Sequence, residues 1–161
     1  MIITIDGPAG AGKTTAARRL AARLGIPYLD TGAMYRVVTL AALTDGVDLA
    51  DEAAVTAIAA RDDYDLDLRA DGIRVLLRGR DVTDEIRTMR VNDHTHYIAA
   101  SPGVRRLLVA KQRSIAARVG ALVTEGRDQG STAFPDADMK FFMHADLSTR
   151  ARRRCDELRA D

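Results

Sequence analysis

The chain has 161 residues, of which 47% are apolar, and this size and composition are typical of one globular domain with a hydrophobic core. The formal net charge is +1, so the overall charge favours neither a nucleic-acid polymer nor an anionic membrane as partner. The single cysteine, Cys155, excludes an internal disulfide and a CxxC metal site. No segment has the apolar length of a signal sequence or a membrane span, so we expect a cytoplasmic protein.

The first segment combines a strand, a glycine-rich loop and a helix. Residues 2–6 are short and β-branched, as in a buried parallel strand, and a helix is predicted from about Thr14 to Leu24. Between them, GPAGAGKT matches the pattern GxxxxGKT, whose glycines allow successive backbone N–H groups to point at phosphate oxygens. The residues predicted to bind a nucleoside triphosphate are Gly7, Pro8, Ala9, Gly10, Ala11, Gly12, Lys13, Thr14 and Thr15.

Two side chains of this loop have predicted chemical roles. Lys13, expected in a solvated loop, would reach the β- and γ-phosphates, and the Thr14 hydroxyl would bind Mg²⁺. The helix that follows adds its positive N-terminal end. The alternative is a glycine-rich turn that only reverses the chain. It has little weight, because Lys and Thr both occupy the required positions between a strand and a helix.

The next segments predict two helices and a small antiparallel unit. DTG at residues 30–32 precedes a helix that carries Arg36 near its start, and Asp51 can cap a third helix. The stretch YDLDLRADGIRVLLRG alternates apolar and polar residues on both sides of a turn at residues 70–72, which indicates a β-hairpin. A further turn at residues 79–81 indicates a third short strand through Val82. This antiparallel unit interrupts an α/β pattern, so we interpret it as an insertion.

The second half of the chain returns to the α/β pattern. Residues 91–100 are predicted as a helix, and Ser101 and Pro102 begin another, on which Arg105 lies just off the apolar stripe. A strand at residues 121–124 ends in EGRD, and ligands of open α/β sheets bind at the carboxyl ends of strands. Residues 139–143 predict a third core strand, and Ser148 opens an arginine-rich helix. The predicted fold is α/β, a P-loop NTPase parallel sheet flanked by helices, with an inserted antiparallel β unit.

The order of these motifs carries a family resemblance. With the P-loop, DTGAMYR, the inserted hairpin, SPGVRRLLVAKQR and EGRDQG in this order, the chain closely resembles the bacterial cytidylate kinases of the nucleoside monophosphate kinase family. The resemblance extends from Ile2 to the C-terminal helix. The P-loop alone would indicate only a P-loop NTPase. The hairpin, DTGAMYR and GRD favour the cytidylate branch, because adenylate kinases lack this insert and carry other signatures.

The resemblance implies an activity and a domain organisation. The activity is transfer of the γ-phosphoryl group of ATP to CMP or dCMP with Mg²⁺. The organisation is one domain over residues 1–161, with a core at about 1–30 and 101–161. A mobile monophosphate-binding region spans about 31–100 and contains the β insert at about 64–83. The implied partners are CMP, dCMP and ATP, with no nucleic-acid polymer and no membrane, and we expect a monomer.

The resemblance also implies which residues hold the acceptor nucleotide. Arg36 and Arg127 would bind its phosphate, and Arg105 and Asp128 would contact the cytosine, with Thr31 close by. A carboxylate suits cytosine, because it accepts from the exocyclic amine, whereas uracil presents an oxygen at that position. The phosphates of the two nucleotides must approach in line although their negative charges repel each other, so this reaction needs positively charged side chains in fixed positions. The expected catalytic set is Lys13, Arg127 and Asp128.

Other polar residues are assigned less directly. Arg150 and Arg154 resemble arginines of the family that contact ATP, whereas Arg152 and Arg153 are interpreted as a solvated helix face. Many cytidylate kinases carry a serine where this chain has His96, so no base contact is carried over to it. A general-base role for the glutamate of EGRD is disfavoured, because a phosphate acceptor is already ionised.

The family pattern continues beyond what this sequence contains. It normally adds a lid, a last core strand and a helix, so we expect the chain to be truncated before the lid. Alternative functions are a UMP, shikimate or thymidylate kinase on the same fold, or a nucleotide-binding module without catalysis. Asp128 and the insert favour cytosine, and the retention of Lys13, Thr14, Arg36, Arg105 and Arg127 argues against a non-catalytic module.

Overall fold

A parallel four-stranded sheet forms the centre of the protein. The structure, a computed structural model, describes residues 1–160, apart from the side chains of Arg154 and of residues 156–160. The strand order is β2-β6-β1-β7, and each neighbouring pair is parallel. The strands are β1 (Ile2–Asp6), β2 (Tyr28–Asp30), β6 (Leu122–Gly126) and β7 (Met139–Phe142). The predicted α/β class is therefore confirmed.

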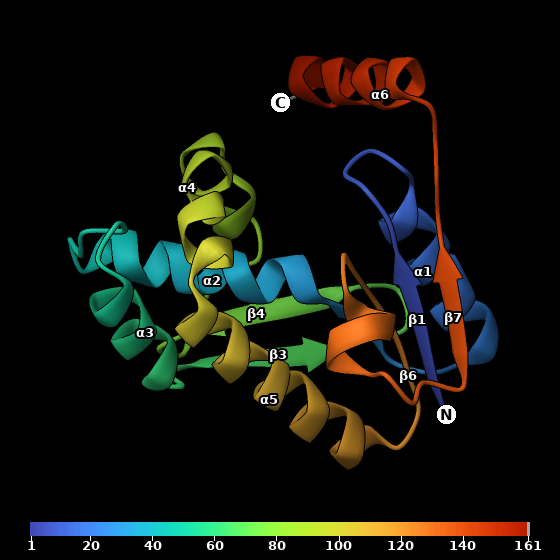
Figure 1. Cartoon of the computed structure of the whole chain (residues 1–161), viewed down its shortest axis with the longest axis horizontal. Coiled ribbons are helices and arrows are strands. Elements are labelled where there is room, and N and C mark those ends of the chain that lie inside the picture. Colours follow the sequence, from blue (N-terminus) through green and yellow to red (C-terminus); the bar gives the residue numbers. More distant parts are fainter. Residues whose placement is uncertain (161) are drawn as a thin grey trace.

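Helices cover both faces of this sheet, because its central strands are buried on both sides (Figure 1). On one face, helix α1 (Lys13–Leu24) buries Ala17 and Ala21 against a cluster that includes Ile3, Ile5 and Val123. Small residues on α1 permit this close approach. On the other face, α2 (Thr31–Thr44) and α5 (Pro102–Val119) contribute to the larger core.

The predicted insertion forms a separate antiparallel sheet. Its strands are β3 (Tyr64–Leu68), β4 (Ile73–Leu77) and β5 (Arg80–Asp81). The turn between β3 and β4 is bonded to the parallel sheet and to α1. The Tyr28 N–H donates to the Arg69 carbonyl at 3.1 Å, and Arg18 Nε donates to the Asp71 carbonyl at 2.5 Å. The tip of the insertion is therefore anchored on β2 and on α1, the helix that follows the P-loop.

The remaining elements connect these layers. They are α3 (Glu52–Ala60), the 3₁₀ turn η1 (Glu85–Arg87), α4 (Met89–Ala100), the π-helical turn η2 (Gln129–Ala133) and α6 (Leu147–Ala160). The predicted cap of α3 is present, because an Asp51 carboxylate oxygen accepts from the Ala54 N–H at 3.0 Å. Ser101 caps α5 in the same way through the Val104 N–H, at 3.2 Å. Both caps were readable from the sequence.

The end of the chain differs from the prediction in two respects. Strand β7 lies at the edge of the sheet, and Met139, Phe141 and Phe142 are 51%, 50% and 71% exposed, so this strand is not a buried core strand. An apolar run does not reveal whether a strand has one neighbour or two. Helix α6 begins at Leu147 and is capped by Asp146, whose carboxylate accepts from the Thr149 N–H at 2.8 Å.

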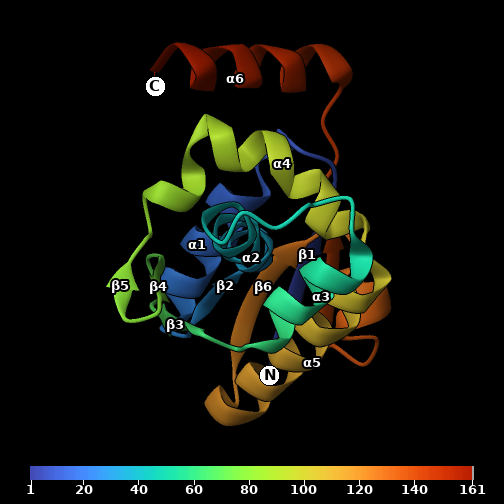
Figure 2. The same cartoon turned by 90° about the vertical axis from the view of Figure 1, so that its left-hand side faces the viewer.

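The two views place the possible functional elements at one end of the molecule. Figures 1 and 2 show α6 on the side toward which α4 and the loop between β1 and α1 point. The carboxyl ends of the parallel strands open toward this side as well. None of the described helices combines the length and the apolarity that crossing a bilayer requires.

Candidate active site

Three parallel strands bring acidic side chains to one edge of the sheet. Asp6 ends β1 beside Gly126 of β6, and Asp30 ends β2 beside Glu125. Asp6 then fixes the loop that follows β6, because its two carboxylate oxygens accept from the Gln129 and Gly130 N–H groups, each at 2.8 Å. This pairing determines where the GRD segment stands relative to the P-loop.

The backbone of the P-loop requires glycine. Gly7 has φ of 148°, and a Cβ atom there would lie 2.2 Å from the carbonyl oxygen of Met143, the residue after β7, so no other residue fits unless this backbone moves. Gly12 caps α1 in the left-handed conformation with φ of 94°. The loop thus wraps over the N-terminus of α1, where backbone N–H groups and the helix dipole favour an anion.

Lys13 and Thr14 meet Glu125 at the first turn of α1. The Thr14 hydroxyl donates to Glu125 at 2.5 Å, and the Tyr28 hydroxyl donates to the same carboxylate oxygen at 2.9 Å. Lys13 Nζ donates to the Pro8 carbonyl at 3.0 Å and lies 4.0 Å from the second Glu125 oxygen. Lys13 was expected in a solvated loop. That expectation is wrong, because Lys13 begins the helix and its side chain is only 11% exposed.

Burial dominates the electrostatics of this group. It lowers the pKa of Lys13, although the Glu125 charge opposes the shift, and it raises the pKa of Glu125, although hydrogen bonds from Thr14 and Tyr28 oppose that shift. Both directions disfavour the charged forms, so the ion pair at 4.0 Å compensates burial only in part. A bound anion beside Lys13 and a cation beside Glu125 would restore the balance.

The residues at this point fit a triphosphate with Mg²⁺. The Thr14 hydroxyl and the Glu125 carboxylate are adjacent oxygen donors, which Mg²⁺ prefers. Near the loop, the Arg150 Nε atom is buried and has no hydrogen-bond partner among the described residues. A Cβ atom at Gly10 would lie 3.2 Å from the Cβ of Arg150, so α6 approaches the loop closely. An unpaired guanidinium nitrogen in this position suits a phosphate oxygen.

Two of the other arginines of α6 lie on its exposed side. Arg153 is exposed, in agreement with its interpretation as part of a solvated face, and its Nη1 also donates to the Gly10 carbonyl at 2.9 Å. Arg152 is exposed, as expected. The side chain of Arg154 lies outside the described residues. Helical periodicity alone did not reveal the contact of Arg153, because the P-loop is far away in sequence.

The predicted base-binding residues come together from two elements. Arg105 of α5 donates through Nη2 to the carboxylate of Asp128, in the loop after β6. Burial raises the pKa of the nearby Tyr35 phenol, on which the charges of Arg105 and Asp128 act in opposite directions. Tyr35 was not predicted as a site residue. Its place beside Arg36 in DTGAMYR was the available signal.

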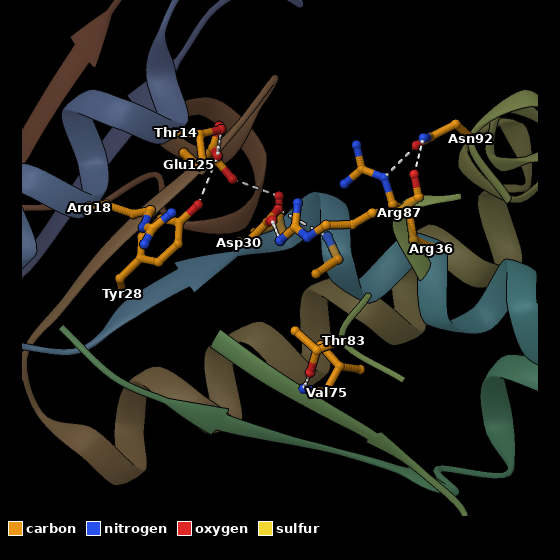
Figure 3. A network of polar contacts seen from close by, with 12 residues as sticks. Thr14, Arg18, Tyr28, Asp30, Arg36, Val75, Thr83, Arg87, Asn92 and Glu125 are labelled. Carbon is orange, nitrogen blue, oxygen red and sulfur yellow. Dashed lines mark hydrogen bonds and ion pairs between the residues drawn. The ribbon is translucent and has the colours of Figure 1, made fainter. Parts of the chain in front are cut away.

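The remaining predicted acceptor residues lie between these two groups. The Thr31 hydroxyl donates to the Glu125 carbonyl at 2.7 Å and is buried. The charge of Arg127 lowers the pKa of Lys13, which places this guanidinium within electrostatic range of the P-loop. Arg36 donates through Nε to the Asn92 side chain at 2.9 Å. Figure 3 shows the contacts of Thr14 and Tyr28 with Glu125, of Arg87 with Asp30, and of Asn92 with Arg36.

This arrangement, a phosphate-binding loop facing a guanidinium and carboxylate pair, agrees with the comparison with known families. A family model described as cytidylate kinase matches residues 3–161. The chain belongs to the cytidylate kinase family. The resemblance found in the sequence is thereby confirmed for nearly the whole chain.

Individual members of the cytidylate kinase family are similar to this chain over most of its length. The cytidylate kinase of Pelotomaculum thermopropionicum is 50% identical over 159 residues, which cover 98% of this chain and 70% of that protein. The cytidylate kinase of Bordetella pertussis is 48% identical over 157 residues, covering 98% and 68%. The bifunctional pantoate ligase/cytidylate kinase of Synechococcus elongatus is 49% identical over 164 residues, covering 99% and 31%.

Several contacts in this cytidylate kinase fold could not be anticipated from the sequence. Asn92 and Arg87 belong to no motif, and they reach the site only because α4 and η1 pack against α2. Tyr28 falls in a predicted strand region, where an aromatic residue is ordinarily part of the core. Tyr28 is in fact buried, and its hydroxyl donates to Glu125.

Proposed function

We propose that the protein transfers the γ-phosphoryl group of ATP to CMP or dCMP, giving ADP and CDP or dCDP. The observation that carries this proposal is the contact between Arg105 and Asp128 beside Tyr35, on the sheet edge that also holds the P-loop. A carboxylate accepts from the exocyclic amine of cytosine, and the neighbouring guanidinium donates to an oxygen or ring nitrogen. Membership of the cytidylate kinase family supports the same conclusion.

On the donor side, we assign the triphosphate to residues 7–15. Backbone N–H groups of the loop would bind the β-phosphate, and Lys13 would turn from Glu125 toward the β- and γ-phosphates. Arg150 would add a further cation from α6. Thr14 and, directly or through water, Glu125 would hold Mg²⁺, which when bound would neutralise the charge that develops on the phosphate groups.

On the acceptor side, we assign the phosphate to Arg36 and Arg127. Its oxygen is already ionised and needs no general base, so the buried Glu125 is left for the metal rather than for proton transfer. Two polyanions repel each other, and positioned arginines lower this cost while holding the reacting atoms in line. Arg127 is suited to contact both nucleotides, because its charge acts on Lys13.

The expected division of labour follows from these assignments. The core at about 1–30 and 101–161 would hold ATP, and the region at about 31–100 would hold the monophosphate. We expect a cytoplasmic monomer that acts on small nucleotides. Size-exclusion chromatography with light scattering tests the oligomeric state, and a dimer at micromolar concentration would contradict it.

A nucleotide panel tests the activity. CMP, dCMP, UMP, AMP and GMP are each combined with ATP and Mg²⁺ and the full chain, and release of ADP is coupled to NADH oxidation. We expect CMP and dCMP to give the highest kcat/KM. Release of ADP at the same rate without any acceptor would contradict a monophosphate kinase. A preference for UMP or AMP would reject the assignment of Asp128 to the base.

A further inference from the structure

We propose that Asn92 is the positioning residue that aims Arg36 at the acceptor phosphate while leaving the charge of Arg36 available. The inference rests on the proposed function, because it takes Arg36 as a phosphate ligand. Asn92 lies in the first turn of α4, and Arg36 lies on α2. No sequence motif connects Asn92 with Arg36, and only the packing of α4 against α2 brings them together.

Both polar atoms of the Asn92 side chain form hydrogen bonds, one as acceptor and the other as donor. Its Oδ1 accepts from Arg36 Nε at 2.9 Å, and its Nδ2 donates to the Arg87 carbonyl at 2.7 Å (Figure 3). The second bond prevents rotation of the amide, so the oxygen must face the guanidinium. Fixing Nε defines the plane of the guanidinium and leaves its two Nη groups to donate to an anion.

A second contact holds the same junction. Arg87 Nη2 donates to Asp30 Oδ2 at 3.2 Å, and Asp30 caps α2 through its other oxygen, which accepts from the Ala33 N–H at 3.0 Å. The N-terminal part of α2 is therefore tied at two points to η1 and the first turn of α4, through Asp30 with Arg87 and through Arg36 with Asn92. The plane of the Arg36 guanidinium is thereby set relative to the carboxyl end of β2.

The neutrality of Asn92 distinguishes Arg36 from neighbouring arginines. Arg105 is paired with Asp128, and Arg87 is paired with Asp30. Among the residues whose side chains are described, no salt bridge is recorded for Arg36. An amide orients a guanidinium without supplying a negative charge that a phosphate dianion would have to displace. An aspartate at the same position would compete with the phosphate and would also face the Arg87 carbonyl with a second acceptor.

Binding measurements and kinetics test this role. Calorimetry compares CMP with cytidine, which lacks the phosphate, for wild type, Asn92→Ala, Asn92→Asp and the control Asp93→Ala, an exposed neighbour on the same helix. We expect Asn92→Ala to weaken CMP binding about tenfold and cytidine binding less than about twofold. Asn92→Asp should weaken CMP binding more than Asn92→Ala does. Asp93→Ala should change neither. Thermal unfolding of each variant separates a local effect from loss of the fold.

Kinetics should show the same pattern, with KM for CMP raised about tenfold and KM for ATP and kcat changed less than about threefold. A double-mutant cycle with Arg36→Met completes the test, because Asn92→Ala should have no further effect once the guanidinium is absent. Equal losses for CMP and cytidine, or the same loss in the Arg36→Met background, would overturn the proposal. Failure of wild type to phosphorylate CMP would instead contradict the proposed function, whereas the comparison of CMP with cytidine binding does not depend on turnover.

Discussion

The donor half and the acceptor half of the candidate site are built in different ways. The donor half is centred on one continuous stretch, residues 7–15, whose backbone shape depends on glycines and on the start of α1, and Glu125 and Arg150 join it from β6 and α6. The acceptor half takes Arg36 from α2, Arg105 from α5 and Asp128 from the loop after β6. These residues meet only when three elements pack together.

This difference predicts different consequences of substitution. Changes in the donor half should affect the chemical step, because the cations of the donor half stabilise the phosphoryl group during its transfer. Changes in the acceptor half should affect which nucleotide binds and how tightly. A donor-half variant that alters base preference, or an acceptor-half variant that alters only kcat with every acceptor, would break the comparison.

The largest effect is expected for Lys13→Ala. Loss of the cation beside the β- and γ-phosphates should lower kcat on the order of 10³-fold or more, with little loss of stability. The fold should survive because burial already disfavours the charge of Lys13, as its lowered pKa indicates. A coupled ADP assay measures turnover, and thermal unfolding measures stability. Arg19→Ala, an exposed charge on the same helix, is the control and should stay within about twofold of wild type.

The next largest effect is expected for Asp128→Asn, which sharpens the acceptor side of the comparison. Wild type should prefer CMP to UMP by about ten- to a hundredfold in kcat/KM, because a carboxylate opposed to an oxygen of uracil is a buried mismatch. The Asp128→Asn side chain keeps an oxygen that accepts from Arg105 but adds an amide donor that suits uracil, so the ratio of kcat/KM for CMP to kcat/KM for UMP should decrease. Asp136→Asn, at an exposed position, should leave it unchanged. An unaltered ratio in Asp128→Asn would remove this residue from base selection.

A smaller effect concerns Glu125 and pH. Burial raises the pKa of Glu125 above its ordinary 4.5, so the folded protein retains a proton that the unfolded chain releases. Stability from this group is therefore lost as pH rises from the unfolded pKa through the folded pKa. Glu125→Gln cannot ionise, so as pH rises from the unfolded pKa of about 4.5 toward the raised folded pKa, the unfolding temperature of this variant should rise relative to that of wild type. Differential scanning calorimetry without nucleotide measures the gap. A gap that shrinks over this interval would contradict the raised pKa.

The smallest effect is expected for Arg18→Ala at the tip of the insertion. This variant removes the hydrogen bond from Nε to the Asp71 carbonyl, at an exposed position where water can replace it. We expect a loss of about 0.5–1 kcal/mol in the free energy of unfolding, measured by urea titration. Arg19→Ala again serves as the matched control. A loss several times larger would mean that the insertion is held to the donor half mainly at this point.

The sequence by itself determined the elements whose signals are local. The P-loop, the caps at Asp51 and Ser101 and the hairpin turn at residues 70–72 depend on neighbouring residues, so their patterns were sufficient. It also determined the family, because the motifs occur in a fixed order along the chain. The identity of the residues that were predicted to surround the nucleotides followed from these motifs.

Only the tertiary structure decided the surroundings of those residues. No local pattern indicated that the Lys13 side chain is largely buried beside Glu125, that Arg153 reaches the Gly10 carbonyl or that Asn92 contacts Arg36. Each contact joins residues far apart in the chain, and their approach depends on how whole helices pack on the sheet. Burial and long-range hydrogen bonding set the pKa of a carboxylate and the direction of a guanidinium, and no local pattern encodes either quantity.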